Sequence, residues 1–255
     1  MSDRIRLGMV GGGEGAFIGA VHRIAARMND HYELVAGAFS SDAQRSQRSA
    51  QALRKQAAWR TDPEQSGAGG STGDIGTHAH HLAGFVTGLE VEELAADLHS
   101  FVDGRVLDDN AHVMMRYRGG AKGMLWCSPV AAGNENALRS RIYGEDGGLE
   151  WSQESPNELW YTPLGEPKRL LTRAGAGASD EAARLSRTPS GHPEGYLEGF
   201  ANIYSEAAAK ILAARDDSPL DEAVHTPGIT DGLAGVGFVD ACVRSSRRNG
   251  AWVKM

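Results

Sequence analysis

The stretch that organises this chain is Gly70-Ser-Thr-Gly-Asp-Ile-Gly-Thr-His-Ala-His-His81. Its glycine-rich first half leads into a helix that the pattern predicts over about residues 75–87. Asp74 and His78 are four residues apart, about one helical turn, so both side chains are expected to project from the same face. An imidazole beside a carboxylate is suited to proton transfer near neutral pH. Asp74 and His78 are therefore the candidate catalytic residues.

Two other interpretations of this stretch stay open. Asp74 could be the N-cap of the helix and satisfy its free amides, a role that can coexist with a catalytic one. Histidine-rich clusters can also bind zinc or manganese, which would involve Asp74 with the three histidines. His78, His80 and His81 cannot all lie on one helix face, however, so no metal site is expected.

The composition is that of a globular protein and argues against several kinds of partner. The 255 residues are 41% hydrophobic and 23% charged, with a formal net charge of -7. That charge argues against nucleic acid or an anionic membrane surface as the main partner. No run approaches the roughly 18 to 20 apolar residues of a membrane span, and the first residues lack the pattern of a signal peptide. Cys127 and Cys242 are expected to be buried free thiols in a reducing cytoplasm.

The beginning of the chain has the pattern of a dinucleotide-binding βαβ unit. A strand is predicted over residues 5–10, a helix over 20–28 and a second strand over 33–39. Between the first strand and the helix lies Gly11-Gly-Gly-Glu-Gly-Ala-Phe-Ile-Gly19. In such a turn, glycines let backbone amides approach a pyrophosphate at the helix N-terminus. The candidate cofactor-binding glycines are Gly11, Gly13 and Gly15, and the third small residue of the fingerprint is either Ala16 or Gly19.

The end of the second strand bears on the choice of cofactor. It reads Phe39-Ser-Ser-Asp42 and does not end in the acid that would bind a ribose 2′-hydroxyl. Ser40, with Ser41 and Arg45, could instead suit a 2′-phosphate. The prediction is NAD or NADP, with a slight preference for NADP.

This nucleotide-binding part is too short to be complete. A six-stranded fold of this kind needs about 30 residues for each βαβ step, well over 100 in all. Only about 53 residues precede Arg54-Lys-Gln-Ala-Ala-Trp-Arg60, after which the chain becomes a polar loop. The predicted domains are therefore a partial nucleotide-binding domain over residues 1–53 and a second domain over 54–255.

The second domain is predicted to be built on an antiparallel sheet. Short strands separated by glycine turns are expected over residues 91–102, 111–117, 121–131, 137–143, 148–153, 159–163 and 168–172. Polar and apolar positions roughly alternate in His112-Val-Met-Met-Arg-Tyr117. That alternation indicates a sheet with one face covered by helices and the other open or paired with another subunit.

The last part of the chain is predicted to hold a loop and two helices. Residues 172–191 are small, polar and glycine-rich, which is typical of a mobile loop. A helix is expected to begin near Pro193, with an apolar stripe formed by Tyr196, Phe200, Ile203 and Ala207. A second helix is expected over 229–244 and a short closing strand at 252–253. His192 at the mouth of the first helix is the candidate substrate contact, although a lone loop histidine can also be simply solvated.

These segments together resemble the Gfo/Idh/MocA family of NAD(P)-dependent oxidoreductases, which act on sugars, inositols and related polyols. The residues that carry the resemblance are Gly8-Met-Val-Gly-Gly-Gly-Glu-Gly-Ala-Phe-Ile-Gly-Ala-Val-His22, Trp59-Arg-Thr-Asp-Pro63, Gly69-Gly-Ser-Thr-Gly-Asp-Ile-Gly-Thr-His78, His192-Pro-Glu-Gly-Tyr196, Asp231-Gly-Leu and Trp252-Val253. The resemblance covers nearly every residue present, in the right order.

The resemblance implies both a fold and a mechanism. The fold is α/β plus α+β: a truncated Rossmann-like N-terminal part followed by an open antiparallel β-sheet domain flanked by helices. By analogy His78 carries the proton, Asp74 orients it or the substrate, and Trp59 and Arg60 lie near the cofactor. The family also implies a homodimer or homotetramer that packs through the open sheet face.

One family motif has no counterpart in this chain. The family has a Glu/Asp-Lys-Pro motif whose lysine positions and polarises the reacting oxygen. The lysines here are Lys55, Lys122, Lys168, Lys210 and Lys254, and none precedes a proline. An internal deletion near residues 53–54 would account for this. The alternative function is therefore a non-catalytic oligomerisation or ligand-binding remnant of such an enzyme.

Overall fold

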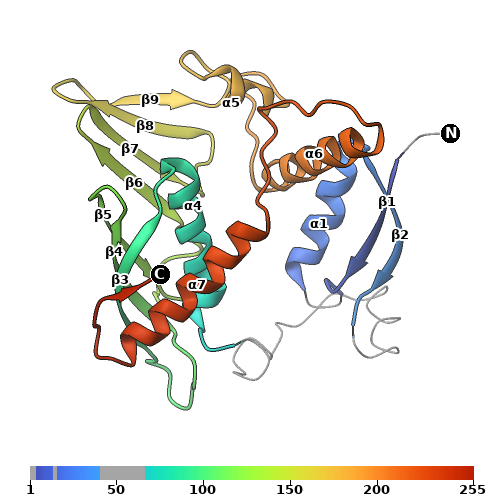
Figure 1. The fold of residues 1–255 in the computed structure, drawn as a ribbon. Helices are drawn as coiled ribbons and strands as arrows, with labels where there is room; N and C mark the ends of the chain where they lie inside the picture. Colours follow the sequence, from blue (N-terminus) through green and yellow to red (C-terminus); the bar gives the residue numbers. More distant parts are fainter. Residues whose placement is uncertain (1–3, 14–15, 41–66) are drawn as a thin grey trace. The chain divides into compact units, whose positions relative to one another are not determined.

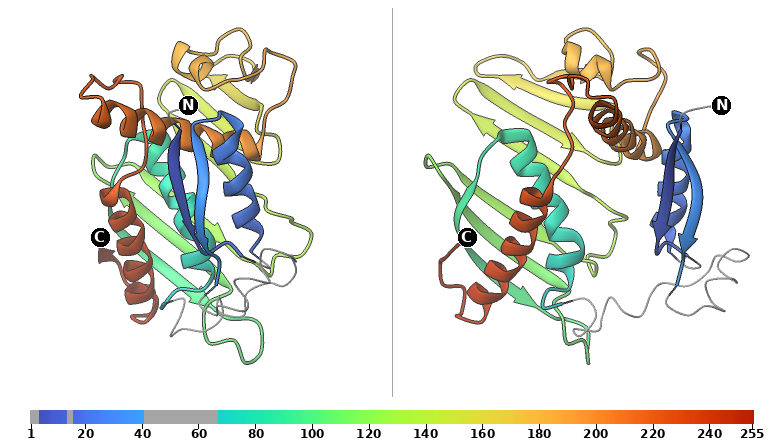
Figure 2. Two further views of the ribbon diagram at one scale, coloured as in Figure 1. Left: turned by 90° about the vertical axis from the view of Figure 1, so that its right-hand side faces the viewer. Right: turned by 45° about the vertical axis from the view of Figure 1, so that its right-hand side comes forward.

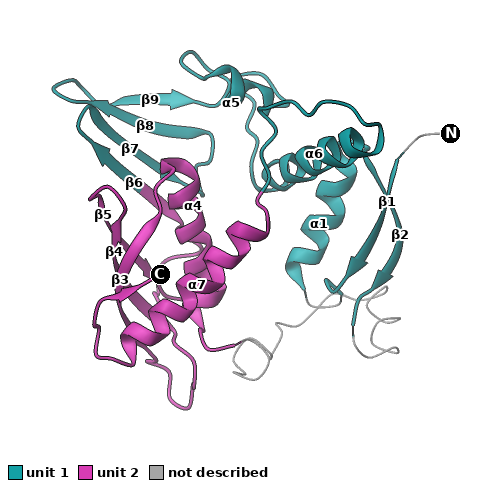
Figure 3. Ribbon diagram, viewed as in Figure 1, with its two compact units in different colours: residues 1–57, 141–226 teal, residues 58–140, 227–255 magenta. Residues whose placement is uncertain are grey.

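The computed structural model describes residues 4–13, 16–40 and 67–255. These residues belong to two compact units (Figure 1, Figure 3). Unit 1 combines residues 1–57 with 141–226, and unit 2 combines 58–140 with 227–255. The predicted boundary at residues 53–54 lies outside the described residues.

Unit 1 begins with the predicted βαβ arrangement. Strand β1 (Ile5–Val10) and strand β2 (Tyr32–Ala38) pair in parallel, and helix α1 (Phe17–Met28) connects them. Figure 2 shows the two strands side by side with α1 along one face. Val21, Ala25 and Ala26 are the buried apolar residues of α1. Short side chains at these positions let the helix lie close to its neighbours.

Helix α6 (Tyr196–Arg215) packs against α1 within unit 1. The predicted apolar stripe on α6 is partly wrong, because Tyr196 is 46% exposed and Ile203 is 50% exposed. The buried face instead includes Ala201 and Ala208. Alanine permits close approach of two helices, so tertiary packing selects a face that side-chain size alone does not indicate.

The rest of unit 1 is antiparallel. Strands β6 (Arg139–Gly144), β7 (Gly147–Ser152), β8 (Glu158–Pro163) and β9 (Arg169–Thr172) form a sheet in that order. The stretch predicted as a loop over residues 172–191 also contains a short helix, α5 (Asp180–Arg184). Ser179 caps α5 by accepting a hydrogen bond from the Ala182 amide, and Asp180 and Glu181 occupy its first turn. A cap and acidic residues of this kind favour a helix start.

Unit 2 is a four-stranded antiparallel sheet covered by helices. Its strands are β3 (Val91–His99), β4 (Asn110–Tyr117), β5 (Lys122–Cys127) and β10 (Val253–Lys254), in the order β10-β3-β4-β5. Helices α4 (Thr77–Thr87) and α7 (Ile229–Ser246) lie on one face (Figure 2).

The core of unit 2 lies between the sheet and these helices. Leu94, Val113 and Leu125 of the sheet pack against Phe238 and other buried residues of α7. The opposite face of the sheet leaves large apolar side chains exposed, with Met114 55%, Met124 83% and Trp126 59% accessible. The structure therefore confirms an antiparallel sheet flanked by helices. No helix among the described residues is both long and apolar enough to cross a membrane.

The two cysteines are buried free thiols, as predicted. Burial raises the pKa of the Cys127 thiol to about 11, although Ser71 lies 3.9 Å away and opposes the shift. Burial raises the pKa of Cys242 as well. Because the thiolate is the reactive form, both cysteines are inert structural residues at neutral pH.

Candidate active site

The glycine turn after β1 uses backbone conformations that favour glycine. Gly11 and Gly12 have φ angles of 82° and 70°, in the left-handed region that favours glycine. The Gly11 amide donates to the Ala38 carbonyl over 2.7 Å, which joins the turn to the end of β2. Gly13 is buried at the same turn, and Gly15 lies outside the described residues.

The sequence left open whether Ala16 or Gly19 is the third small residue of the fingerprint, and the close packing around Gly19 favours Gly19. A Cβ atom on Gly19 would lie 2.2 Å from the Gly12 carbonyl oxygen, so no larger residue fits without a shift of the backbone. Helix α1 therefore packs directly against the turn through Gly12 and Gly19. This contact is the role of the third glycine in a dinucleotide-binding fingerprint.

Arg23 supports the turn from α1 and was not identified from the sequence. Its Nη1 donates to the Gly12 carbonyl over 2.8 Å, and its guanidinium carbon lies 5.8 Å from the centre of the Phe39 ring. Arginines are common on amphipathic helices, so the sequence pattern alone does not single out Arg23. Its contact with the Gly12 carbonyl is seen only in the folded turn.

The described part of unit 1 fits the pyrophosphate end of a dinucleotide. Among the described residues, the N-cap residue of α1, Ala16, makes no side-chain cap hydrogen bond, and the N-terminus of a helix is a favourable place for an anion. Ser40 follows β2 at the same sheet edge as the glycine turn, because the two strands are parallel. Gly11, Gly13 and Ser40 are thus brought to one edge, whereas Trp59 and Arg60 lie outside the described residues.

Asp74 and His78 lie on one continuous helical segment of unit 2. A five-residue π-helical turn, η2 (Thr72–Gly76), continues directly into α4. The Thr77 amide reaches the Thr72 carbonyl, the wider bond that defines such a turn. Thr72 and Gly76 are buried, while Asp74 and His78 are exposed. π-Helical turns are rare and occur frequently at functional sites.

Asp74 is inside this segment and is not its N-cap. The N-cap position is Ser71, and the Asp74 amide is already bonded to the Gly70 carbonyl over 2.9 Å. The carboxylate that satisfies the amides at the start of the turn belongs instead to Asp108, which comes from the loop before β4. Only folding brings that loop to the turn, so the sequence alone did not reveal the cap.

The histidines of α4 do not converge with Asp74 on a metal site. The His80 ring stacks on Phe238 with centroids 4.4 Å apart, so it belongs to the core of unit 2. Burial lowers the pKa of His80, and the neighbouring His81 adds to this effect. Among the residues that the structure describes, no three histidine, cysteine or acidic side chains form a group able to hold a metal ion.

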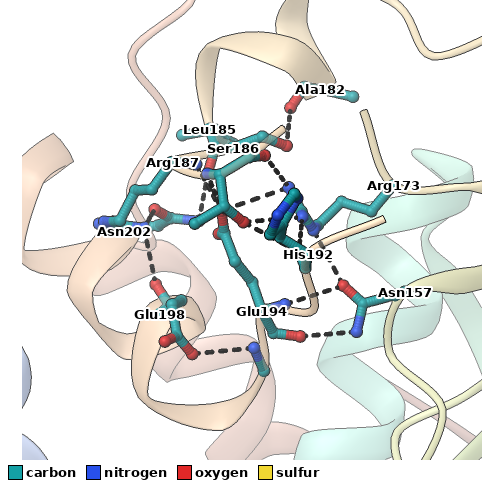
Figure 4. Close-up of polar contacts among 12 residues, drawn as sticks. Asn157, Arg173, Ala182, Leu185, Ser186, Arg187, His192, Glu194, Glu198 and Asn202 are labelled. Carbon is teal, nitrogen blue, oxygen red and sulfur yellow. Dashed lines mark hydrogen bonds and ion pairs between the residues drawn. The ribbon is translucent and has the colours of Figure 1, made fainter. Parts of the chain in front are cut away.

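His192 lies in unit 1, in a loop held by a buried network (Figure 4). The Glu194 carboxylate accepts hydrogen bonds from the Arg187 and Thr188 amides, both over 2.6 Å, and lies 3.2 Å from Arg173 Nη1. Asn157 accepts from the Glu194 amide over 3.1 Å and donates to the Glu194 carbonyl over 2.7 Å. The His192 side chain itself is exposed.

The Glu194 carboxylate is held in its charged form. Burial by itself would raise the pKa of Glu194, but the hydrogen bonds from Thr188 and Arg187, with the charge of Arg173, outweigh it. The resulting pKa lies below the usual range for glutamate. The network is therefore strongest at neutral pH, when the carboxylate is ionised.

Comparison with known proteins agrees with this geometry. A model of the GFO/IDH/MocA C-terminal domain matches residues 17–150. The uncharacterized oxidoreductase YfiI of Bacillus subtilis is 36% identical over 199 residues, which are 77% of this chain but 51% of that protein. The chain thus spans about half the length of this curated relative.

Solved structures extend the similarity to nearly the whole chain. An oxidoreductase from Sinorhizobium meliloti is 46% identical with a TM-score of 0.86, covering 99% of this chain and 100% of that one. An inositol dehydrogenase homolog from Azotobacter vinelandii, solved with NAD+, is 25% identical with a TM-score of 0.91, covering 100% of this chain and 98% of that one. That homolog has also been solved with NADH and myo-inositol. The chain therefore belongs to the Gfo/Idh/MocA family.

Proposed function

We propose that this chain acts as an NAD(P)-dependent oxidoreductase on a sugar, inositol or related polyol. The observation that carries the proposal is the pair of Asp74 and His78 on the exposed edge of a helical turn whose other edge is buried. A homolog bound to NADH and myo-inositol supports both the cofactor and the class of substrate.

His78 is the proposed proton carrier. In the oxidation direction a ring nitrogen of His78 accepts the proton of the substrate hydroxyl, and in the reduction direction it returns that proton. The Asp74 carboxylate, about one helical turn away, is proposed to orient the imidazole or the substrate. When bound, the nicotinamide cofactor supplies the acceptor or donor of hydride.

The cofactor is proposed to bind through the glycine turn. Gly11 and Gly13 allow the pyrophosphate to approach the amides of α1, and Gly15 is proposed to extend this contact. Ser40 is proposed to contact the ribose, with a slight preference for NADP over NAD. Trp59 and Arg60 are proposed to lie near the cofactor. His192 is proposed to contact the substrate.

The chain is also proposed to form a homodimer or homotetramer. The argument is the exposed apolar face of the sheet in unit 2, where Met114, Met124 and Trp126 are more than half accessible. Exposed apolar patches of this kind mark interaction surfaces. A cytoplasmic location is proposed because both cysteines are free and buried.

A non-catalytic remnant is the second candidate. The observation that favours it is the missing Lys-Pro motif of the family: no lysine of the chain precedes a proline. In this case the sheet and its helices would persist as an oligomerisation or ligand-binding module.

Titration of NADH and NADPH into the purified protein separates the two candidates. Saturable binding in the micromolar range, followed by nicotinamide fluorescence or calorimetry, is the expected result and justifies a screen of polyols that begins with myo-inositol. A folded protein that binds neither cofactor would reject the oxidoreductase proposal. Binding without turnover of any polyol would favour the remnant.

A further inference from the structure

The carboxylate of Asp108 binds the start of the helical turn that carries the candidate catalytic pair. Its Oδ1 accepts the Gly70 amide over 2.6 Å. Its Oδ2 accepts the Ser71 hydroxyl over 2.7 Å, and the Thr72 amide and hydroxyl over 2.9 Å each. The Asp108 carbonyl additionally accepts the Ser71 amide over 2.8 Å. Asp108 itself is buried, so these bonds are shielded from water.

We propose that Asp108 is a positioning residue that fixes the π-helical turn and thereby sets the direction of Asp74 and His78. This inference rests on the proposed function, in which His78 carries the proton. It concerns a residue 30 positions after His78 along the chain, whose carboxylate binds Gly70, Ser71 and Thr72.

The turn needs an external anchor because its own sequence favours helix weakly. Residues Thr72–Gly76 contain two glycines, and each costs a helix about 1 kcal/mol relative to alanine. A π-helical turn is also a rare conformation that a chain does not extend by itself. The bonds from Asp108 satisfy the amides of Gly70 and Thr72 where the turn begins.

Close packing also fixes the buried edge of the helical segment, at both of its ends. A Cβ atom on Gly70 would lie 2.2 Å from the Asp108 carbonyl oxygen, so the backbone meets the 107–108 loop directly. At the other end, a Cβ atom on Gly76 would lie 3.3 Å from Cys127 Sγ. With the inner edge fixed in this way, Asp74 and His78 on the outer edge have a defined direction.

Asparagine cannot replace this carboxylate. Each oxygen of Asp108 accepts a backbone N–H, from Gly70 at Oδ1 and from Thr72 at Oδ2. An asparagine amide group in either orientation would direct its own N–H toward one of these donors. Asp108→Asn therefore breaks the anchor at one of its two oxygen positions, with almost no change in side-chain volume.

The neighbouring residue provides a matched control. Asp109 is also buried, and its two oxygens accept the amides of Phe101 and Val102 over 2.8 and 3.0 Å. Asp109→Asn thus disrupts the same kind of bonding, but in the loop after β3 and not at the turn that carries His78.

The test compares the two variants by kinetics with the polyol that the substrate screen identifies. For Asp108→Asn we expect kcat to fall at least about tenfold, with KM and the dissociation constant of NADH little changed and the His78 limb of the pH profile displaced. Asp109→Asn should lose stability comparably but keep kcat and the pH profile. Equal kinetic defects in the two variants, or an unchanged pH profile for Asp108→Asn, would overturn the proposal.

A spectroscopic readout separates this inference from the proposed function. NMR of the 13C-labelled histidine ring, with His78→Gln to assign the signal, reports the surroundings of the His78 ring whether or not the protein turns over substrate. We expect Asp108→Asn to move the His78 ring signal and Asp109→Asn to leave it unchanged. If Asp108→Asn does not fold, Thr72→Val removes one bond to Oδ2 and should move the signal by less. An unchanged His78 signal in the folded variant contradicts the proposal.

Discussion

Glycine is used at single positions of this chain where a Cβ atom has no room. Gly19 is the strongest example in unit 1, because its Cβ position lies 2.2 Å from a backbone carbonyl that cannot rotate away. Gly199 of α6 is a useful contrast, since nothing lies within 4 Å of its Cβ position.

Gly19→Ala should therefore destabilise the protein by about 1–3 kcal/mol, the cost of forcing atoms into a packed site. Gly199→Ala should be neutral or stabilise by up to about 1 kcal/mol, because alanine favours a helix. Urea unfolding of the two variants measures both effects. Similar unfolding free energies for the two would show that the contact between Gly12 and Gly19 is not tightly packed.

His78→Gln is expected to lower turnover by about 10²–10⁴-fold, the usual contribution of a general acid or base. The side chain is exposed, so the unfolding free energy should change by less than about 0.5 kcal/mol. Steady-state kinetics with the polyol found in the substrate screen provides the measurement. His99→Gln, also at an exposed position of unit 2, is the control and should retain full turnover. A His78→Gln enzyme with wild-type kcat would remove His78 from the mechanism.

At the scale of elements, the loop before α6 depends on one ionised carboxylate. Glu194 joins the 187–188 backbone to Arg173, and its folded-state pKa is lowered. A lowered pKa means that the stabilisation is fully present above the unfolded pKa of about 4.3 and is lost as the pH falls through the folded value.

Glu194→Gln should consequently cost about 1–3 kcal/mol at neutral pH, because buried amides lose a charged acceptor. The difference from the wild type should shrink as the pH falls through the lowered folded-state pKa of Glu194, because the wild-type side chain then becomes protonated and neutral as well. Denaturant unfolding at several pH values checks this trend. Glu166→Gln, in an exposed pair with Arg169, is the control and should cost less than about 1 kcal/mol. A constant difference across the pH range would contradict the assignment to the Glu194 charge.

At the scale of the whole molecule, the open sheet face of unit 2 leads to a prediction about assembly. Met124→Glu places a charge at an 83% accessible apolar position and should convert an oligomer to monomers. Light scattering coupled to size-exclusion chromatography measures the mass. Leu164→Glu changes a 77% accessible residue of unit 1 and should leave the oligomer intact. A wild-type protein that is already monomeric would refute the proposed use of this face.

Local patterns in the sequence determined much of this architecture. The strand–glycine–helix–strand opening, the strands of the antiparallel sheets and helix α7 lie within a few residues of their predicted positions. Asp74 and His78 lie on one continuous helical segment, as their spacing of four residues indicated. These features depend on periodicity, turn residues and neighbours within one helical turn, all of which are local properties of the chain.

Tertiary structure decided the features that join distant residues. The choice of Gly19 over Ala16 depends on the Gly12 carbonyl, and the buried face of α6 depends on α1. Asp108 caps a turn that begins 36 residues earlier, at Thr72. A buried carboxylate bound to amides in another part of the chain has no periodic signal in the sequence. Only the folded backbone brings these donors and acceptors together, and burial then makes each missing bond costly.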